Sequence, residues 1–189
     1  MTVLVGPDGV SRCPWGDEPA MRAYHDTEWG QVVHGDDALF ERLSLEAFQS
    51  GLSWAIVLRK RERFREVFAG FDPKRVAELG PPDVERLMAD AGIIRNRRKI
   101  EAVIANARVL LDLDGSLDDL LWSFAPTAAP AARVSASQVP ASTAESVALA
   151  KELRRRGFQF VGPTTAYATM QATGIVDDHL AGCVARSSR

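Results

Sequence analysis

The sequence predicts an all-α fold built as one domain. Apolar residues recur at helical spacing along most of the 189 residues. Proline, glycine and capping residues separate these periodic segments, as helix boundaries do. No segment shows a convincing strand ladder, and "FQFVG" is too short to build a sheet. A chain of this length fits one domain with its own core, so residues 1–189 form one predicted domain, with flexible ends at about 1–11 and 185–189.

In the first half of the chain, a cap or a proline opens each predicted helix. Asp36 and Asp37 cap the first of these helices, and Gly51 breaks it. Its apolar positions are Leu39, Phe40, Leu43 and Phe48. A second helix runs from about Ser53 through "SWAIVLRKRERFREVFA". The segments "DPKRVAEL" and "PPDVERLMADA" each begin with proline, which the first turn of a helix tolerates.

The same signals predict the helices in the second half of the chain. The segment "NRRKIEAVIANARVLLDL" is a long amphipathic helix, and "SLDDLLWSF" is a short one. The apolar face of the long helix comprises Ile100, Val103, Ile104, Ala107 and Leu111. Residues 125–142, rich in Ala, Pro, Ser and Thr, form a predicted extended loop. Ser142 and Glu145 then make a capping box for a helix that ends near Gly157. The last helix lies in "GPTTAYATMQATG", with Thr164 or Thr165 near its start and Gly174 at its end.

Composition places the chain among globular proteins of the cytoplasm. Its residues are 46% hydrophobic and 25% charged. No apolar run approaches the roughly 20 residues of a membrane span, and the first residues lack a signal-peptide pattern. The net charge of −2 argues against a general nucleic-acid binder, but positive charge is concentrated in "LRKRERFRE", "IRNRRKIE" and "ELRRRGF". These clusters fit either solvated helix faces or a DNA-facing side.

Both cysteines and two of the three histidines form a possible metal-ligand set. Cys13 and His25 lie near the start of the chain, and His179 and Cys183 lie four residues apart near its end. Thiolate and imidazole groups of this kind bind zinc tetrahedrally. Four protein ligands leave no open position, so zinc here would be structural and would join the two ends of the chain. The alternative is a pair of ordinary structural histidines.

A second motif is a helical hairpin in "VERLMADAGIIRNRRKIEAVIANA". Gly92 permits a turn with positive φ, and Ile93 and Ile94 can pack between the helices. Backbone N–H groups at the start of the second helix can bind a phosphate. The surrounding positive charge comes from Arg95, Arg97, Arg98 and Lys99. The pattern resembles a helix-hairpin-helix, which holds the DNA backbone without reading sequence, but an ordinary helical hairpin explains it equally well.

A third feature is a carboxylate among aromatic residues. Glu46 lies within an otherwise apolar helix, and burial without a partner would be costly. The aromatic residues that could surround it are Trp15, Tyr24, Trp29 and Trp54. Such a pocket suits a flat, amino-bearing ring, held by stacking and cation–π attraction and read by the carboxylate at its N–H edge. The alternative is that the aromatics belong to the core and Glu46 pairs with an arginine.

Several strings together resemble the 3-methyladenine DNA glycosylase I family, usually called TAG. They are "YHDTEWG", "LEAFQSGLSW", "DAGIIRNRRKI", "RRGFQFVGPTTAYATMQATG" and "DDHLAGC", in family order from about Arg12 to Cys183. The resemblance implies an all-α helix-hairpin-helix glycosylase fold whose zinc site joins the N- and C-terminal segments.

The resemblance also implies roles for particular residues. The zinc ligands would be Cys13, His25, His179 and Cys183. Glu46 would recognise the flipped base and Trp54 would stack on it, with Tyr24, Trp29 and Trp15 as further pocket walls. Gly51 and Leu52 would enter the DNA stack beside the lesion, and the hairpin residues Gly92, Ile93, Ile94, Arg95, Arg97 and Lys99 would contact DNA. Two departures stand out. The stretch between Cys13 and His25 is one residue shorter than the family pattern, and Met21 replaces a pocket tyrosine.

The implied activity is hydrolysis of the N-glycosidic bond of 3-methyladenine in double-stranded DNA, a base-excision repair reaction. Glu46, Tyr24 and Trp54 would be the residues at the reacting base. No lysine beside the hairpin is placed for Schiff-base attack, so no strand cleavage is expected. The nearest aspartates after the hairpin, Asp112 and Asp114, lie at the far end of a long helix and do not match a sugar-stabilising carboxylate.

The expected protein is a monomer with one structural zinc and no organic cofactor or membrane contact. Two other classes stay open: a zinc-containing DNA-binding module without catalysis, and a zinc hydrolase, which would need an open coordination position.

Overall fold

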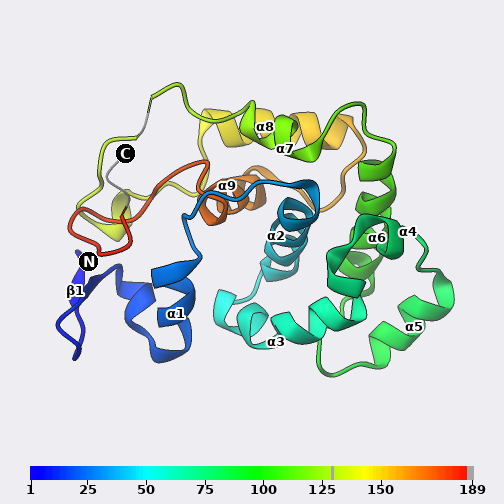
Figure 1. Ribbon diagram of the computed structural model, residues 1–189, viewed down its shortest axis with the longest axis horizontal. Helices are drawn as coiled ribbons and strands as arrows, with labels where there is room; N and C mark the ends of the chain where they lie inside the picture. The colour runs from blue at the N-terminus through cyan, green and yellow to red at the C-terminus, as the bar shows by residue number, and fades with distance from the viewer. Residues whose placement is uncertain (129, 187–189) are drawn as a thin grey trace.

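The computed structural model describes residues 1–128 and 130–186, and this part of the chain is mainly helical (Figure 1). Its α-helices are α1 (Pro19–Thr27), α2 (Asp36–Gln49), α3 (Trp54–Val67), α4 (Pro73–Ala77), α5 (Pro81–Ala89), α6 (Arg97–Leu111), α7 (Leu117–Trp122), α8 (Ala144–Arg155) and α9 (Pro163–Ala172). Short 3₁₀ turns are η1 (Pro14–Asp17), η2 (Ala69–Phe71) and η3 (Ala136–Gln138). The predicted helices are therefore confirmed.

A small antiparallel hairpin corrects the expectation that no strands form. Strand β1 (Leu4–Val5) pairs with β2 (Ser11–Arg12), in the segment that was expected to be a flexible end. Gly9, with φ of +75°, makes the turn between them. Each strand has only two residues, too few to show alternation in the sequence.

The two ends of the described chain lie together on one side of the molecule (Figure 1). The Val184 amide donates to the Ser11 carbonyl at 2.8 Å, and the Ala136 amide donates to the Met1 carbonyl at 2.9 Å. Of the expected flexible end at 185–189, residues 187–189 lie outside the described residues. The segment 125–142, described except for residue 129, contains η3 and otherwise no helix or strand among its described residues.

Helix α2 is the central element and is buried on most of its surface. It packs against α3, α6, α7 and α9, and its core residues are Leu39, Phe40, Leu43, Leu45 and Phe48. The Phe48 and Phe64 ring centroids lie 4.4 Å apart, which joins α2 to α3. Because α2 is central, a polar residue on it can face a cavity lined by several neighbouring elements.

Three local details differ from the sequence prediction. The residue before α2 is Gly35, with φ of 91°, and Asp36 and Asp37 occupy the first turn, where carboxylates favour the helix dipole. Thr143, with Ser146 as its partner, caps α8 in place of Ser142 and Glu145. On α6 the core residue is Leu110, and Leu111 is 47% exposed, because the helix ends there.

No helix in the described part of the chain is both long and apolar enough to cross a bilayer.

Candidate functional site

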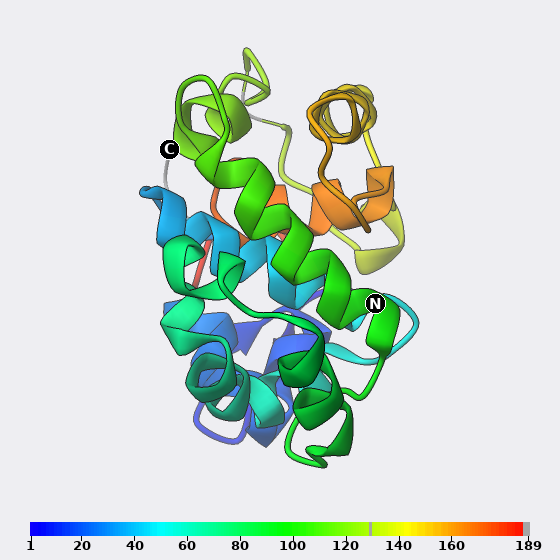
Figure 2. The ribbon, with the colours of Figure 1, turned by 90° about the vertical axis from the view of Figure 1, so that its right-hand side faces the viewer.

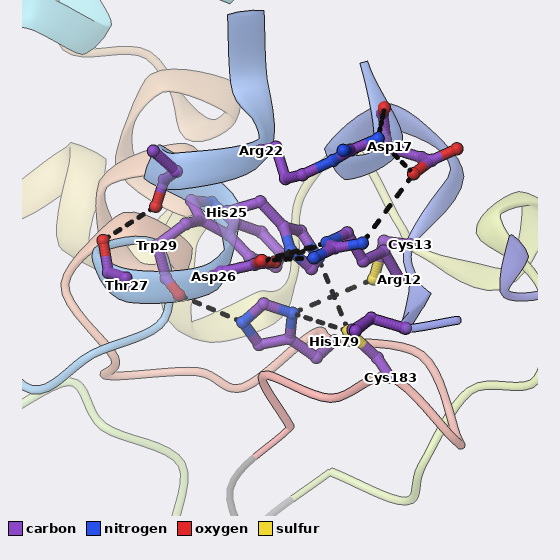
Figure 3. A network of polar contacts seen from close by, with 12 residues as sticks. Arg12, Cys13, Asp17, Arg22, His25, Asp26, Thr27, Trp29, His179 and Cys183 are labelled. Atoms are coloured by element: carbon purple, nitrogen blue, oxygen red, sulfur yellow. Dashed lines mark hydrogen bonds and ion pairs between the residues drawn. The ribbon is translucent and has the colours of Figure 1, made fainter. Parts of the chain in front are cut away.

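A buried cluster of two cysteines and two histidines joins the ends of the chain (Figure 3). Cys13 precedes η1, His25 lies on α1, and His179 and Cys183 lie in the turns after α9. All four potential ligand atoms lie within 4.8 Å of one another. The Cys183 Sγ lies 3.4 Å from His25 Nε2 and 3.5 Å from His179 Nδ1. Tetrahedral zinc with ordinary bond lengths separates sulfur and nitrogen ligands by about 3.5 Å, so the cluster has the spacing zinc requires.

Neighbouring groups orient both imidazoles towards the sulfurs. His25 Nδ1 donates to the Asp26 carboxylate at 2.7 Å, which leaves Nε2 as the ligand atom. Arg12, itself 4% exposed, holds that carboxylate at 2.8 Å. His179 Nε2 donates to the Trp29 carbonyl at 3.0 Å, which leaves Nδ1 as the ligand atom. Such outer partners fix the tautomer of metal-binding histidines, so the donor set fits zinc.

The interaction between the two sulfurs is the largest influence on their protonation. It lowers the pKa of Cys183, which also faces both imidazoles, and it raises the pKa of Cys13 together with burial. The pair therefore favours a thiolate at Cys183, the form that binds a metal.

Gly16 is a supporting residue that the sequence analysis did not single out. A Cβ at this position would lie 2.3 Å from two ring atoms of His25, closer than any side chain allows. A Cβ at Gly30, which has φ of +78°, would make a tight contact of 3.0 Å with His179 Nε2. In the sequence, both glycines lie close to the predicted ligands Cys13 and His25. Their spacing from these ligands does not show that they contact a histidine ring.

Replacing Gly16 by alanine is expected to displace the His25 ring and to lower metal affinity about 10- to 100-fold. Competition with a chelator, with the metal content of the protein as readout, measures this. Gly80→Ala is the matched control, since its Cβ would meet only Pro82 at 3.7 Å. Unchanged metal affinity in Gly16→Ala would show that the glycine does not support the ligand.

An open cavity of about 310 Å³ lies beside the cluster. Its lining combines all the aromatic residues expected in the pocket with Glu46 and several residues that were not expected. The full lining is Trp15, Glu18, Met21, Tyr24, Trp29, Glu46, Gln49, Ser53, Trp54, Ala55, Ala168 and Gln171. The structure therefore brings together residues of η1, α1, α2, α3 and α9.

The aromatic walls are packed against one another and against the cysteine–histidine cluster. Trp15 and Trp29 meet edge to face with centroids 5.0 Å apart, and Tyr24 lies 5.2 Å from Trp54. Trp29 also meets His179 edge to face at 4.6 Å. The cluster thus supports the wall of the cavity directly.

Glu46 is the buried acidic group of this cavity. Its side chain is 6% exposed, and within the described residues no hydrogen bond reaches it. Arg42, the expected type of partner, instead binds Glu28 at 3.1 Å. Burial raises the pKa of Glu46 to about 8, although Arg42 acts in the opposite direction. Burial therefore favours the protonated form of Glu46 over the carboxylate that the sequence analysis expected.

Two further polar atoms in the cavity lack partners within the described chain, the Tyr24 hydroxyl and Trp54 Nε1. Burial raises the pKa of Tyr24, so its hydroxyl stays neutral. Buried polar groups are normally hydrogen-bonded. Together with Glu46, these atoms offer hydrogen bonds to a flat polar ligand.

Gln49 and Gln171 are cavity residues that the sequence analysis missed. Gln171 on α9 donates to Asp178 at 2.7 Å, which fixes its amide orientation. Asp178 is buried and also binds Arg133 and Tyr167. Met21 is 5% exposed and lines the cavity where the family resemblance implies a tyrosine.

The predicted hairpin is formed by α5, the turn 90–96 and α6. Gly92 does not have a positive φ, which corrects that expectation. Glycine is needed there because a Cβ would lie 2.7 Å from Arg63 Cγ and 2.9 Å from Asp90 Oδ1. Ile93 is buried, whereas Arg95 is exposed.

Only some of the backbone N–H groups of the hairpin are free to bind a phosphate. The Gly92 amide donates to Asp90 at 2.7 Å, and Asn96 caps α6 through the Lys99 amide. In the described part of the chain, the amides of Arg95, Arg97 and Arg98 have no hydrogen-bond partner. The Arg97 side chain is 44% exposed and pairs with Glu85.

Lys99 does not face solvent, which corrects the expectation that it contacts a phosphate. It is 7% exposed, and its Nζ donates to the carbonyls of Phe48 and Ser50 at 2.9 and 2.6 Å. The pair Gly51 and Leu52 follows directly. Leu52 is 39% exposed and Gly51 has φ of +83°, so this turn projects an apolar side chain outward.

Comparisons with known proteins agree with this geometry. The sequence model of a family described as methyladenine glycosylase matches residues 15–186. DNA-3-methyladenine glycosylase 1 of Escherichia coli (strain K12) is 47% identical over 92% of this chain and 96% of its own length. A crystal structure of 3-methyladenine DNA glycosylase I (TAG) superimposes with a TM-score of 0.89 at 46% identity, covering 93% of this chain and 100% of the other. A variant of 3-methyladenine DNA glycosylase I, solved in complex with 3-methyladenine, has a TM-score of 0.88 at 33% identity, covering 94% of this chain and 98% of that chain.

Proposed function

The chain belongs to the methyladenine glycosylase family, and from this premise we propose that it excises 3-methyladenine from double-stranded DNA without cleaving the strand. It is a DNA repair glycosylase, acting in this proposal as a single-domain monomer. The observation that carries the proposal is the cavity in which Glu46, Tyr24 and Trp54 combine unpartnered polar groups with aromatic walls.

In this proposal the cavity receives the base after it leaves the DNA stack. Trp54 stacks on the purine, while Tyr24, Trp15 and Trp29 form the remaining walls. Protonated Glu46 can accept from the exocyclic amino group through one oxygen and donate to a ring nitrogen through the other. The relative solved with 3-methyladenine supports this ligand class for the cavity.

The chemistry asks little of the protein, because the methyl group at N3 makes the base cationic. When the bond between the base and the sugar breaks, the electron pair goes to the base, which leaves as a neutral molecule. A water molecule adds to the sugar and loses a proton. An ionised Glu46 would stabilise the cationic base of the substrate more than the neutral base that departs, which would slow the reaction. A neutral Glu46 avoids this selective stabilisation of the ground state.

Leu52 is the residue proposed to fill the space vacated by the flipped base, and we call it the wedge residue. It is exposed in the turn between α2 and α3, two residues before Trp54. Extraction of a base costs a few kcal/mol, and a filling side chain lowers that cost. The two residues that follow Leu52, Ser53 and Trp54, line the cavity, which supports this role.

The helix-hairpin-helix of α5 and α6 is proposed to hold the DNA backbone. The unpartnered amides of Arg95, Arg97 and Arg98 lie at the start of α6, where the helix dipole favours a phosphate. Gly92, Ile93 and Ile94 shape the turn. Such contacts position the duplex and do not read its sequence.

Zinc is proposed as the metal of the buried cluster, with Cys13, His25, His179 and Cys183 as ligands. Four protein ligands give a closed site, so bound zinc would stabilise the junction of the chain ends and leave the reaction to the cavity residues. The proposal of no strand cleavage is supported by the two lysines at the hairpin, which are both engaged: Lys99 is buried and bound to two carbonyls, and Lys60 donates to the Ala91 carbonyl at 2.6 Å.

Release of free bases from methylated DNA, resolved by chromatography, tests the activity. The full chain is expected to release 3-methyladenine and to leave 7-methylguanine and the strands in place. Trp54→Ala is expected to lower the rate by about 10²-fold, since stacking contributes about 1–3 kcal/mol per base. If folded, zinc-loaded protein binds methylated DNA and releases no base, the chain is a DNA-binding module and the proposal is wrong.

A further inference from the structure

Lys99 joins two elements that the proposed function assigns to different tasks. It belongs to the first turn of α6, the helix of the hairpin, and its ammonium group reaches the end of α2. In Figure 2 the start of α6, in green, lies next to the cyan turn that follows α2. The contact is therefore a direct link between the hairpin and the turn that carries Leu52.

The two acceptors of Lys99 are carbonyls at the C-terminal end of a helix. Helix α2 ends at Gln49, and Ser50 and Gly51 leave the helical conformation. The last carbonyls of a helix have no partner inside it and carry partial negative charge, which a cation complements. Nζ thus fixes the carbonyls of Phe48 and Ser50 on both sides of the point where α2 stops.

The burial of Lys99 distinguishes it from the other cations of the hairpin. Arg95, Arg97 and Arg98 are exposed, whereas Lys99 is 7% exposed and has no carboxylate partner within the described residues. Desolvation lowers its pKa, as burial of an ammonium group does. A buried cation held only by carbonyls is costly to keep, and a leucine or methionine would cover the same apolar surface. A lysine in this buried position calls for a role that depends on its two hydrogen bonds.

We propose that Lys99 is a positioning residue that fixes the wedge residue Leu52 relative to the hairpin that holds the DNA backbone. This inference rests on the proposed function. The hairpin contacts to the DNA backbone determine which base pair lies at the cavity. Base flipping requires that Leu52 enter the stack at that same base pair. Nζ sets this register by connecting the first turn of α6 to the start of the α2–α3 turn.

The test uses the full-length, zinc-loaded chain with Lys99→Met, which keeps the length and removes the donors. Single-turnover release of 3-methyladenine from duplex DNA is expected to slow about 10- to 100-fold, as for a misplaced reacting group. Affinity for free 3-methyladenine is expected to stay the same, because Lys99 does not line the cavity. Lys99→Arg keeps donors at this position and is expected to recover part of the rate.

Salt dependence separates positioning from a phosphate contact. In the exposed control Arg95→Ala, loss of one phosphate contact is expected to reduce the slope of log affinity against log salt by about 0.9. The slope in Lys99→Met is expected to match that of the wild-type chain. A reduced slope in Lys99→Met would overturn the proposal and make Lys99 a phosphate contact.

A double-mutant cycle tests the dependence on Leu52. If Lys99 acts through the wedge residue, Lys99→Met slows excision far less in a Leu52→Ala background than in the wild-type chain. Equal slowing in the two backgrounds would contradict the proposal. The defect is also expected to shrink when the lesion is mispaired, since flipping then costs less.

Two outcomes of these experiments must be kept apart. If Lys99→Met does not fold, Lys99→Gln, which retains one donor group, enters the same cycle. If the wild-type chain releases no base, the proposed function fails; if it releases the base but the cycle is additive, only the role of Lys99 fails.

Discussion

Replacing Cys183 by serine is expected to abolish stoichiometric zinc binding and to lower the melting temperature by about 8–16 °C. The reason is that the cluster joins Cys13, before α1, and His25, on α1, to His179 and Cys183, after α9. Structural zinc in small peptides is worth about 10–16 kcal/mol at neutral pH. Loss of only a third of that, about 4 kcal/mol, corresponds to the stated shift for a chain of this size.

Metal analysis and thermal unfolding measure this effect, and removal of zinc from the wild-type chain by a chelator is expected to match it. The control is His34→Ala, which changes the one histidine outside the cluster. His34 binds Asp118 at 2.8 Å on the surface and is 61% exposed, so its loss should leave zinc content unchanged. Zinc-free wild-type protein with an unaltered melting temperature would contradict a structural metal.

The loss of zinc is also expected to affect the cavity proposed to bind the base. Trp29 contacts His179 through its ring and accepts a hydrogen bond from it through its carbonyl. Once the ligand set is broken, His179 is free to turn, and the wall formed by Trp29 and Trp15 loses its support. Weaker binding of free 3-methyladenine in folded Cys183→Ser, below its melting temperature, is the expected sign of this coupling.

Much of this site could be predicted because its chemistry depends on rare residue types. Both cysteines and two of three histidines fall into one cluster, and a carboxylate in an apolar helix stands out in any sequence. Such residues are informative because few alternatives explain them. The helices could be predicted for a similar reason, since periodicity and caps are local.

The remaining features depend on contacts between distant segments. Lys99 lies among arginines in the sequence, and only the packing of α6 against the end of α2 shows that it is buried. Gln171 has no distinctive neighbours in the sequence, but its hydrogen bond to Asp178 orients its amide, and it lines the cavity. Gly92 lies close to the Arg63 side chain and Gly16 lies close to the His25 ring, so a Cβ at either position would clash. Sequence rules for turns do not predict such contacts. The raised pKa of Glu46 likewise comes from burial between helices that are separate in the sequence.

Replacing Glu46 by glutamine is expected to stabilise the protein at alkaline pH. The pKa of Glu46 rises from 4.5 to about 8 on folding because its carboxyl is buried. The folded chain therefore binds the proton more tightly than the unfolded chain does. Stability from this group is complete below pH 4.5 and falls by about 1.4 kcal/mol per unit as the pH rises towards 8. A glutamine does not titrate, so the variant escapes this loss.

Urea unfolding at pH 5 and at pH 9 measures the difference between the two chains. The gain of Glu46→Gln over the wild-type chain should be several kcal/mol larger at pH 9. Glu28→Gln is a control whose effect should not change between these two pH values. Burial acts to raise the pKa of Glu28, but ion pairs with Arg61 and Arg42 more than reverse this and lower it. Glu28 is thus ionised in both the folded and the unfolded chain at pH 5 and at pH 9, so Glu28→Gln should lose the same stability at both values. Equal pH profiles for the wild-type chain and Glu46→Gln would contradict the assignment.

The same proton is expected to govern recognition of the base. Neutral 3-methyladenine entering the cavity displaces the remaining water around Glu46, which disfavours the ionised carboxylate further. By linkage, binding of the free base must weaken as the pH rises through about 8. Titration calorimetry is expected to show this decline in the wild-type chain and a flat profile in Glu46→Gln. Glu46→Leu, which removes donor and acceptor together, should lose binding at every pH. A wild-type affinity that increases above pH 8 would mean that the ionised carboxylate is the form that reads the base.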